Sequence, residues 1–391
     1  MVKYVERAIR PKFELLLSYF PVVALLGVRQ VGKTSFVKNY LTQHPSDYVY
    51  LDLERPGDLY KLADPVEYFD VHQDKCVIID EVQRNAELFP ALRGIIDNDR
   101  RPGKIILLGS ASPSLLRDSG ESLAGRIAYL ELTGLTALEL ASTDVSPSTR
   151  WLRGGFPDSV LAPNDVLSWS WRDSFITTYI HKELPELGLR VDARTLRNFW
   201  RMLAHSNGQL LNYERLANSL GVTSKTVKGY LSFFERSYLI RQLPPYHVNL
   251  KKRLVKSSKV YIRDTGILHH LLSIQSYGNL LGRPEKGGSY EALAIEQICS
   301  ALPTTATPYF FRTHQGAEID LVIELNGKLW AAVEIKANSA PKLSKGFYLS
   351  CDELKIDRRF LVAPVDSSYP TKHGVIVLDI ASLLEILQEI Q

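Results

Sequence analysis

The sequence predicts an α/β protein made of several modules, and three observations support this fold class. From about residue 20, short apolar runs alternate with turn residues and amphipathic stretches, which is typical of a parallel sheet with helical crossovers. Two compact helical stretches then flank Gly221, and later two strand-like runs flank Asn326-Gly327, a strong hairpin signal. A chain of 391 residues is also too long for one ordinary hydrophobic core, so two to four modules are expected.

Four apolar runs are the expected strands of the first sheet, at residues 22–26, 48–53, 76–79 and 105–108. A stretch rich in Ser, Thr and Pro over residues 140–150 ends this regular section and places the first boundary there. The terminal unit is expected to contain a helix followed by strands at 318–325 and 330–335. The predicted modules are a parallel-sheet domain, a helical lid or linker, a small helical module and a terminal α/β domain, at residues 1–145, 146–205, 206–275 and 276–391.

The composition is that of a globular protein of mixed charge. The formal net charge is +4 and 45% of the residues are hydrophobic, a balance too even to identify a charged partner. Three distant cysteines, Cys76, Cys299 and Cys351, lack metal-like spacing and argue against a disulfide framework. The apolar runs have strand length, far short of a bilayer span, and the first residues form no secretory apolar region. We therefore expect a cytoplasmic protein without membrane contact.

A phosphate-binding loop is predicted directly after the first apolar strand. Residues 27–34 match G-x-x-x-x-G-K-[ST] between a strand and a helix that begins near Thr34, which is the context this motif requires. Gly27 and Gly32 let backbone N–H groups approach the phosphates, Lys33 reaches the β and γ oxygens, and the Thr34 hydroxyl ligates Mg²⁺. We therefore expect ATP and Mg²⁺ as cofactors. The other nucleotide-binding candidates of the loop are Arg29, Gln30 and Ser35.

An acidic strand end supplies the expected hydrolytic group. Residues 77–81 read Val-Ile-Ile-Asp-Glu, so Asp80 can hold Mg²⁺ and Glu81 can activate the attacking water. The following strand ends at Ser110, which we expect to sense the γ-phosphate beside the acidic strand. This arrangement favours ATP hydrolysis over nucleotide binding alone.

Two arginines are candidates for neutralising the charge of the transition state. Arg126 follows Gly125, and Arg117 lies upstream of it. Either side chain could act on the nucleotide of a neighbouring subunit, or could be a solvated surface arginine. The first possibility predicts a homo-oligomer, with a hexamer as one candidate form.

A helix-turn-helix pattern covers residues 211–227. Ala217 permits close helix approach, Gly221 makes the turn, and Val227 packs inward. The second helix exposes Lys225 and Lys228, which suits it to contacts with DNA.

A basic segment follows this helix pair. No acidic residue occurs between Glu235 and Asp264, whereas eight basic residues do, which predicts a local basic surface that suits DNA phosphates. The alternative is a module that docks a protein or forms an oligomer. The eight are Arg236, Arg241, Lys251, Lys252, Arg253, Lys256, Lys259 and Arg263. The DNA-binding candidates are Lys225, Lys228, Lys251, Lys252, Arg253 and Lys256.

The terminal domain carries an E, D, E-x-K pattern. Glu291 lies on an expected helix, Asp320 on a strand, and Glu334 and Lys336 on the same face of the next strand. Asp320 and Glu334 could hold Mg²⁺ while Lys336 activates water, with Glu291 assisting. This pattern resembles that of restriction-endonuclease-like nucleases. The fold could equally persist only to grip or sense DNA.

The motifs together resemble one known family over nearly the whole chain. They occur at residues 27–35, 80–83, 109–110 and 122–126, then at 154–157, 212, 243–246, 259–261 and 264–266. This order resembles a widespread prokaryotic family of AAA+ ATPases that carry a C-terminal domain formerly of unknown function. The resemblance implies an AAA+ P-loop domain, a winged-helix module and a restriction-endonuclease-like domain at the end.

Three functional hypotheses remain open from the sequence. The first is an ATPase that couples hydrolysis to movement along, or remodelling of, duplex or branched DNA. The second is an ATP-gated regulator or sensor whose winged helix binds a protein or a promoter. The third is an ATP-gated, metal-dependent nuclease.

Overall fold

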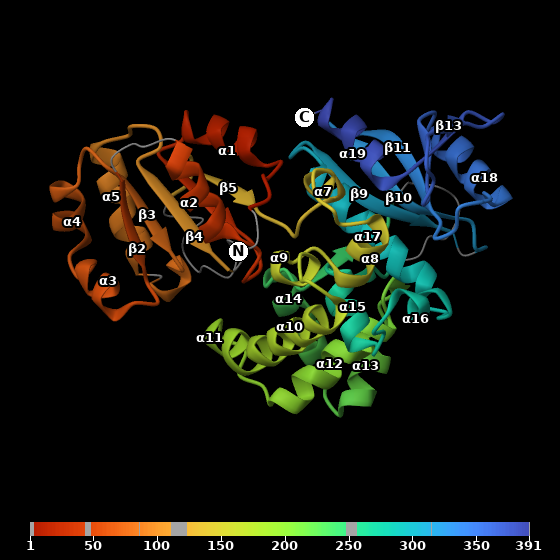
Figure 1. Ribbon diagram of the computed structural model, residues 1–391, viewed down its shortest axis with the longest axis horizontal. Helices are drawn as coiled ribbons and strands as arrows, with labels where there is room; N and C mark the ends of the chain where they lie inside the picture. Colours follow the sequence, from red (N-terminus) through yellow and green to blue (C-terminus); the bar gives the residue numbers. More distant parts are fainter. Residues whose placement is uncertain are drawn as a thin grey trace. The chain divides into compact units, whose positions relative to one another are not determined.

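The computed structural model describes residues 4–43, 48–85, 87–110, 123–247, 256–313 and 315–390 (Figure 1). The chain forms two compact units. The first comprises Met1–Gly134 with the short segments Glu186–Leu189 and Arg236–Tyr238, and the second comprises Leu135–Pro185, Arg190–Glu235 and Leu239–Gln391. The regions 146–205, 206–275 and 276–391 thus contribute most of their residues to one unit, and their division into separate modules stays a prediction.

The first unit contains a parallel sheet of five strands, as the sequence predicts. The strand order is β2-β3-β4-β1-β5. The strands are β1 (Val22–Leu26), β2 (Tyr48–Asp52), β3 (Cys76–Asp80), β4 (Ile105–Gly109) and β5 (Ile127–Glu131). All five residues of β1 and all five of β4 are buried, because helices cover both faces of a parallel sheet. Only β5 was not among the expected strands.

Helices cover the two faces of this sheet. Alternate residues of β1, such as Ala24, pack with Leu92 and Ile96 of α5 on one face. On α1 and α2, Phe13 and Phe36 meet edge to face at 5.1 Å between ring centroids. The helical elements are α1 (Arg10–Leu17), α2 (Lys33–Gln43), α3 (Pro56–Lys61), α4 (Pro65–Val71), η1 (Val82–Arg84) and α5 (Leu88–Asn98).

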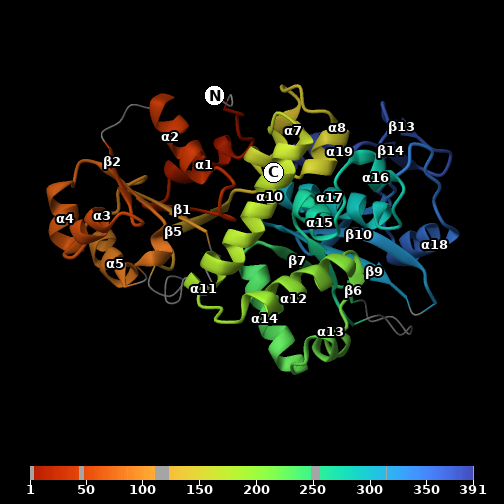
Figure 2. The ribbon, with the colours of Figure 1, turned by 60° about the horizontal axis from the view of Figure 1, so that its bottom comes forward.

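A helical region opens the second unit and leads to a helix pair with a small sheet. It contains α7 (Ala137–Leu140), α8 (Pro147–Arg153), α9 (Pro157–Val160), α10 (Asp165–Thr178), η2 (Tyr179–Glu183), α11 (Leu184–Glu186), α12 (Ala193–His205), α15 (Thr265–Leu271) and α16 (Tyr277–Leu281). The helix pair is α13 (Tyr213–Leu220) and α14 (Ser224–Arg236). The small sheet has the order β6-β8-β7, from β6 (Gln209–Leu210), β7 (Ile240–Leu243) and β8 (Lys259–Ile262). Figure 2 shows α12, α13 and α14 beside one another.

The predicted turn between α13 and α14 is confirmed. Gly221 has φ +68°, a left-handed conformation that glycine adopts without a steric penalty, and it ends α13. The Asn212 side chain accepts a hydrogen bond from Arg215 N at 2.9 Å and so caps the start of the same helix. Ala217 and Val227 are buried, as the sequence predicts.

A sheet of six strands completes the second unit. Its order is β13-β14-β12-β11-β10-β9. The predicted hairpin is confirmed, because Asn326 (φ 52°) and Gly327 (φ 75°) both adopt positive φ between paired antiparallel strands. The elements are α17 (Lys286–Ala301), β9 (Ala306–Arg312), β10 (Glu318–Leu325), β11 (Lys328–Ile335), α18 (Lys345–Leu354), β12 (Arg359–Val362), β13 (Tyr369–Pro370), β14 (Val375–Leu378) and α19 (Ile380–Gln388). Among the described residues, no helix is long and apolar enough to cross a membrane.

Candidate functional site

The loop after β1 has a backbone that two glycines make possible. Gly27 has φ +152°, and a Cβ placed there would lie 2.2 Å from the Leu132 carbonyl oxygen. Gly32 has φ +100°, and Gln30 between them adopts φ +63°. Any larger residue at Gly27 would displace the backbone of the strand-end segment beside it. Gly27 is therefore required by the close approach of backbone to backbone, and Gly32 by its positive φ.

Lys33 lies folded over this loop. It is the first residue of α2 and only 6% exposed, and its Nζ donates to the carbonyl oxygens of Gly27 (2.8 Å) and Val28 (3.1 Å). The first turn of α2 contains no acidic residue, so the positive end of the helix dipole is not offset. Lysine and helix end together favour an anion in the loop. Ser35 and Gln30 are exposed beside it.

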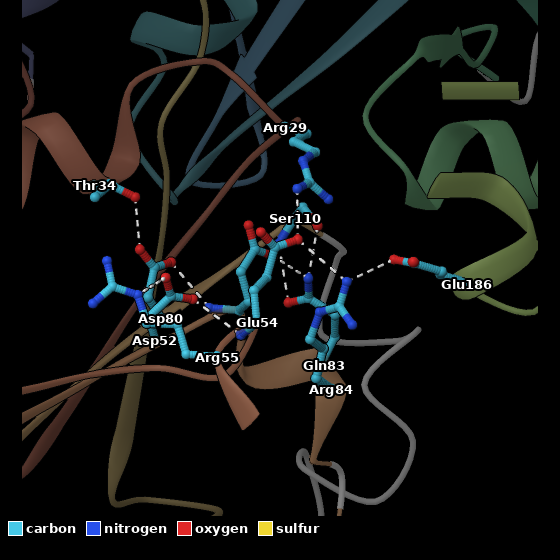
Figure 3. A network of polar contacts seen from close by, with 11 residues as sticks. Arg29, Thr34, Asp52, Glu54, Arg55, Asp80, Gln83, Arg84, Ser110 and Glu186 are labelled. Atoms are coloured by element: carbon cyan, nitrogen blue, oxygen red, sulfur yellow. Dashed lines mark hydrogen bonds and ion pairs between the residues drawn. The ribbon is translucent and has the colours of Figure 1, made fainter. Parts of the chain in front are cut away.

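Two oxygen ligands suited to Mg²⁺ meet at the end of β3. The Thr34 hydroxyl donates to Asp80 Oδ2 at 2.6 Å (Figure 3). The Tyr50 hydroxyl donates to the same oxygen. The other Asp80 oxygen accepts from Glu81 N at 2.9 Å. Hydroxyl and carboxylate oxygens are the hard ligands that Mg²⁺ prefers, so Thr34 and Asp80 fit the predicted metal.

The Glu81 carboxylate is held by an amide. Glu81 has φ +56° and is followed by η1, which brings the Gln83 side chain back toward it. Gln83 Nε2 donates both to Glu81 Oε2 and to Ser110 Oγ, the latter at 2.9 Å. Burial raises the pKa of Glu81 above its usual value. The structure thus brings together the predicted pair Glu81 and Ser110, through a glutamine that was not among the predicted site residues.

An ion-pair chain leads away from the loop. Arg29 pairs with Glu54 at 2.6 Å, Arg84 pairs with Glu54 at 3.2 Å, and Arg84 also pairs with Glu186 at 3.0 Å (Figure 3). Arg29 was predicted to bind nucleotide, and here its guanidinium contacts a carboxylate next to the loop. Glu186 belongs to the short segment Glu186–Leu189 of the first unit. Glu54 and Arg84 were not predicted, because they follow different strands and only strand order brings them together.

Arg126 lies beside the start of β1, whereas the loop follows the end of that strand. Its carbonyl accepts a hydrogen bond from the backbone N–H of Val22, the first residue of β1. The strand rises about 3.3 Å per residue, so β1 separates the two by about 16 Å. The Arg126 guanidinium makes two bonds to Asp97, at 2.7 and 2.9 Å, which with Arg100 lower the pKa of that carboxyl to about 2. Arg117 lies outside the described residues.

The lysines of the helix pair are exposed, as predicted. Lys225 and Lys228 project from α14, and Lys228 Nζ lies 5.1 Å from the ring centroid of Tyr213. Lys256 is also exposed. Lys251, Lys252 and Arg253 lie outside the described residues.

The predicted basic surface is wrong in part. Arg241 and Arg263 both pair with Glu296 of α17, at 2.9 and 2.5 Å. Lys259 is 3% exposed and lies among carboxylates of the second unit. These three cations point into the protein, where they pair with carboxylates. The carboxylates lie on elements that are distant in sequence. A count of charges within the segment therefore could not reveal these ion pairs.

The E, D, E-x-K residues do come together. Lys336 Nζ lies 2.7 Å from Glu334 Oε1 and 4.0 Å from Asp320 Oδ2. Glu291 is joined to this group through Lys259, which also lies near Asp320. Glu291 Oε1 accepts from Lys259 Nζ at 3.0 Å and from the Tyr261 hydroxyl at 2.6 Å.

A magnesium site of the expected form does not fit this cluster. The Lys259 ammonium lies 2.7 Å from Glu318 Oε1 and 3.9 Å from Asp320 Oδ1. It therefore lies beside Asp320, which was expected to hold a metal ion. A divalent ion bound to these oxygens would be forced against a buried positive charge. Across the described residues, no group of three or more His, Cys, Asp or Glu side chains is arranged to hold a metal ion.

Comparison with known proteins agrees with the nucleotide site. Family models match three successive parts of the chain: an AAA domain at residues 19–141, the domain of unknown function DUF8612 at 146–277 and the domain of unknown function DUF4143 at 286–383. The first of these contains the loop, Asp80, Glu81 and Ser110. Fold and site together place the protein in the class of AAA+ P-loop ATPases.

Relatives of nearly full length define the family. The uncharacterized proteins Rv2008c of Mycobacterium tuberculosis and Mb2031c of Mycobacterium bovis are each 38% identical over 364 residues, which is 93% of this chain and 81% of theirs. The chain therefore belongs to the same family as these two mycobacterial proteins.

Likeness to solved structures is lower. The Walker-type ATPase paby2304 of Pyrococcus abyssi matches with a TM-score of 0.45 and 16% identity, covering 69% of this chain and 96% of that one. The RuvB Holliday junction branch migration motor of Thermotoga maritima matches with a TM-score of 0.32 and 18% identity, covering 61% and 90%. These similarities are too low to support an argument about function.

Proposed function

We propose that this protein couples ATP hydrolysis to movement along, or remodelling of, duplex or branched DNA. The observation that carries the proposal is that one chain combines two features. The first is the loop with Lys33 and Thr34 beside Asp80 and Glu81, and the second is a helix pair that exposes Lys225 and Lys228. The order of α12, β6, α13, α14, β7 and β8 is that expected of a winged helix.

The hydrolytic step follows from the positions of the side chains. ATP displaces the Lys33 ammonium from the carbonyls of Gly27 and Val28, and the ammonium then contacts the β and γ oxygens. Mg²⁺ held by Thr34 and Asp80 would neutralise phosphate charge. Glu81 accepts the proton of the water that attacks the γ-phosphorus, and the bond to the β–γ bridging oxygen breaks.

Ser110 and Gln83 fix the orientation of this base. The Gln83 amide connects the Ser110 hydroxyl to the Glu81 carboxylate. A γ-phosphate that reaches Ser110 would therefore also change the hydrogen bonds of Glu81. Burial raises the Glu81 pKa, which makes the carboxylate a stronger base.

Arg126 is proposed to act on a neighbouring subunit. The length of β1 keeps it away from the loop of its own chain, since Arg126 adjoins the first residue of that strand. If Arg126 neutralises transition-state charge, it therefore does so at the loop of another copy, which requires a homo-oligomer. Asp97 would hold the guanidinium until the copies assemble.

DNA is proposed to bind the exposed face of α14. Lys225 and Lys228 are one turn apart, so both point to the same side of the helix and can contact adjacent phosphates. Lys256 is also exposed, and Ser257 beside it lines the same pocket as Lys228. The inward pairing of Arg241, Lys259 and Arg263 limits the surface to fewer cations than the sequence suggests.

Measuring ATP turnover with and without DNA tests the proposal. Phosphate release should rise on adding duplex or four-way-junction DNA, and the rise should vanish in Lys225→Ala/Lys228→Ala. The matched control is Lys372→Ala, an exposed lysine elsewhere in the second unit. Turnover that is indifferent to every DNA form, with no DNA binding at low salt, would contradict the proposal.

A second candidate is an ATP-gated regulator or sensor. The ion-pair chain from Arg29 through Glu54 and Arg84 to Glu186 favours it, because a change at the loop would reach the segment Glu186–Leu189. Slow turnover and ATP-dependent assembly without DNA movement, measured by light scattering, would favour this function over the first. Loss of ATP-dependent assembly in Arg84→Ala would show that this assembly depends on the ion-pair chain.

A further inference from the structure

A buried group of carboxylates and lysines lies where four elements of the second unit meet. The carboxylates come from α17, β10 and β11, and one lysine comes from β8. The sequence suggested a metal centre here. The members are Lys259, Glu291, Glu318, Asp320, Glu334 and Lys336, which we call the acidic cluster.

Lys259 is the most completely enclosed cation of the acidic cluster. Its side chain is 4% exposed, compared with 36% for Lys336. The ammonium contacts Glu318 Oε1 at 2.7 Å and Glu291 Oε1 at 3.0 Å, and it lies 5.5 Å from the ring centroid of Phe310. Such an ammonium cannot turn to solvent without breaking both ion pairs, because its stem is buried with it.

The position of this ammonium conflicts with a metal ion. Mg²⁺ binds oxygens at about 2.0–2.1 Å. An ion that bridged Asp320 Oδ1 and either Glu291 Oε1 or Glu318 Oε1 would share oxygens that lie 2.7 to 3.9 Å from Lys259 Nζ. An ion between Asp320 Oδ2 and Glu334 Oε1 would meet the Lys336 ammonium, which lies 4.0 and 2.7 Å from these two oxygens, and the other Glu334 oxygen is buried without a hydrogen-bond partner among the described residues. Two positive centres would then lie within a few ångströms of each other in a buried site, where their repulsion is weakly screened.

A backbone donor and a hydroxyl donor further hold Asp320 and Glu291. Asp320 Oδ2 accepts from Ile335 N at 2.9 Å, and Glu291 Oε1 also accepts from the Tyr261 hydroxyl at 2.6 Å. Tyr261 lies two residues after Lys259 on the same face of β8. The central strand of the small sheet, β8, thus inserts two donors into the acidic cluster.

We propose that Lys259 is the resident cation of the acidic cluster, which serves as an internal joint between β8, α17 and β10 and takes no divalent ion. The joint fixes the helix pair and its small sheet to the terminal sheet. This role explains why an acid-free stretch of sequence contains a buried lysine. It also removes the metal on which nuclease chemistry at this cluster would depend.

Titration of nucleotide-free protein with Mn²⁺ tests the proposal, with calorimetry and the Mn²⁺ resonance signal as readouts. Wild type and Asp320→Asn should behave alike, with no Mn²⁺ bound at the acidic cluster. Lys259→Met should gain one Mn²⁺ site, and Mn²⁺ should raise its melting temperature by several degrees. The gain should disappear in Lys259→Met/Asp320→Asn.

Lys256→Met is the matched control. It removes an exposed lysine three residues earlier and should leave Mn²⁺ binding unchanged. A wild-type Mn²⁺ site that Asp320→Asn or Glu334→Gln abolishes would overturn the proposal. So would a folded Lys259→Met protein with the Mn²⁺ response of wild type. The wild-type titration decides the matter even if Lys259→Met does not fold.

Discussion

Lys33 and Lys259 are two buried lysines whose hydrogen-bond partners differ. Lys33 donates to two backbone carbonyls of its loop, at 2.8 and 3.1 Å. Lys259 pairs directly with Glu318 and Glu291, at 2.7 and 3.0 Å. Both are almost fully buried. What differs is the group to which each ammonium donates, which is a backbone carbonyl for Lys33 and a carboxylate for Lys259.

This difference separates a binding site from a structural joint. A hydrogen bond to a backbone carbonyl contributes only about 0.5–1.5 kcal/mol net, so phosphate oxygens can replace it. Breaking a buried ion pair by removing one partner costs about 3–5 kcal/mol, because a buried charge is left without compensation. The nucleotide loop therefore exchanges its lysine contacts readily, whereas the acidic cluster does not.

The largest effect is expected at Arg126, which we propose acts on the nucleotide of a neighbouring subunit. Arg126→Ala should lower kcat by about 10³-fold or more while ATP binding is retained. Mixing Arg126→Ala with Glu81→Gln protein should restore part of the turnover, since mixed oligomers contain some intact sites. Asp97→Asn is the control and should keep kcat, because it removes only the partner of the arginine. Unchanged turnover in Arg126→Ala would refute the assignment.

Replacing each lysine in turn tests the comparison itself. Lys259→Met should lower the free energy of unfolding by about 3–5 kcal/mol and leave ATP binding intact. Lys33→Met should lower that free energy by about 1–3 kcal/mol, for the loss of two hydrogen bonds to backbone carbonyls, and abolish ATP hydrolysis. Denaturant unfolding and phosphate release measure the two quantities. Equal losses of stability in both variants would show that the two lysines are not used differently.

The stability loss of Lys259→Met should depend on pH. Burial and then the Glu291 charge raise the pKa of Asp320 in the folded protein. A carboxyl with a raised folded pKa stabilises the protein at low pH and loses that contribution as pH rises through the folded pKa. Without the ammonium the pKa of Asp320 should rise further. Lys259→Met should therefore approach wild-type stability at acid pH, and a loss that does not vary with pH would contradict this.

The smallest effect is expected on DNA binding. Lys225→Ala and Lys228→Ala should each reduce the slope of log affinity against log salt by about 1, because each removes one phosphate contact. Fluorescence anisotropy at several salt concentrations measures this slope. Lys372→Ala should leave it unchanged, and a slope equally insensitive to all three substitutions would place DNA elsewhere.

The nucleotide loop could be predicted from sequence because its chemistry is contiguous. Gly27, Lys33 and Thr34 lie within eight residues, and the strand and helix that flank them are also local. Tyr50 and Gln83 could not be predicted in the same way. Tyr50 reaches Asp80 only because β2 pairs with β3, where Asp52 lies opposite Asp80. That pairing depends on the order of strands in the sheet.

The basic segment shows the opposite case, in which a local pattern misled. Counting charges between Glu235 and Asp264 predicted a surface, yet Arg241 and Arg263 find Glu296 on a helix that begins after the segment ends. Lys259 lies in a strand whose four residues are all buried. The run KVYI alternates in side-chain direction, which could have suggested a buried strand, but the identity of its carboxylate partners depends on the tertiary fold.

The measurement that tests the account most directly is phosphate release by wild type beside Glu81→Gln, with ATP binding followed in both. Glu81→Gln should bind Mg²⁺-ATP as wild type does and lose turnover by about 10²–10⁴-fold, because the water is left without a base. Release of phosphate at the wild-type rate by Glu81→Gln, or failure of the wild-type protein to bind ATP, would contradict the assignment of this site.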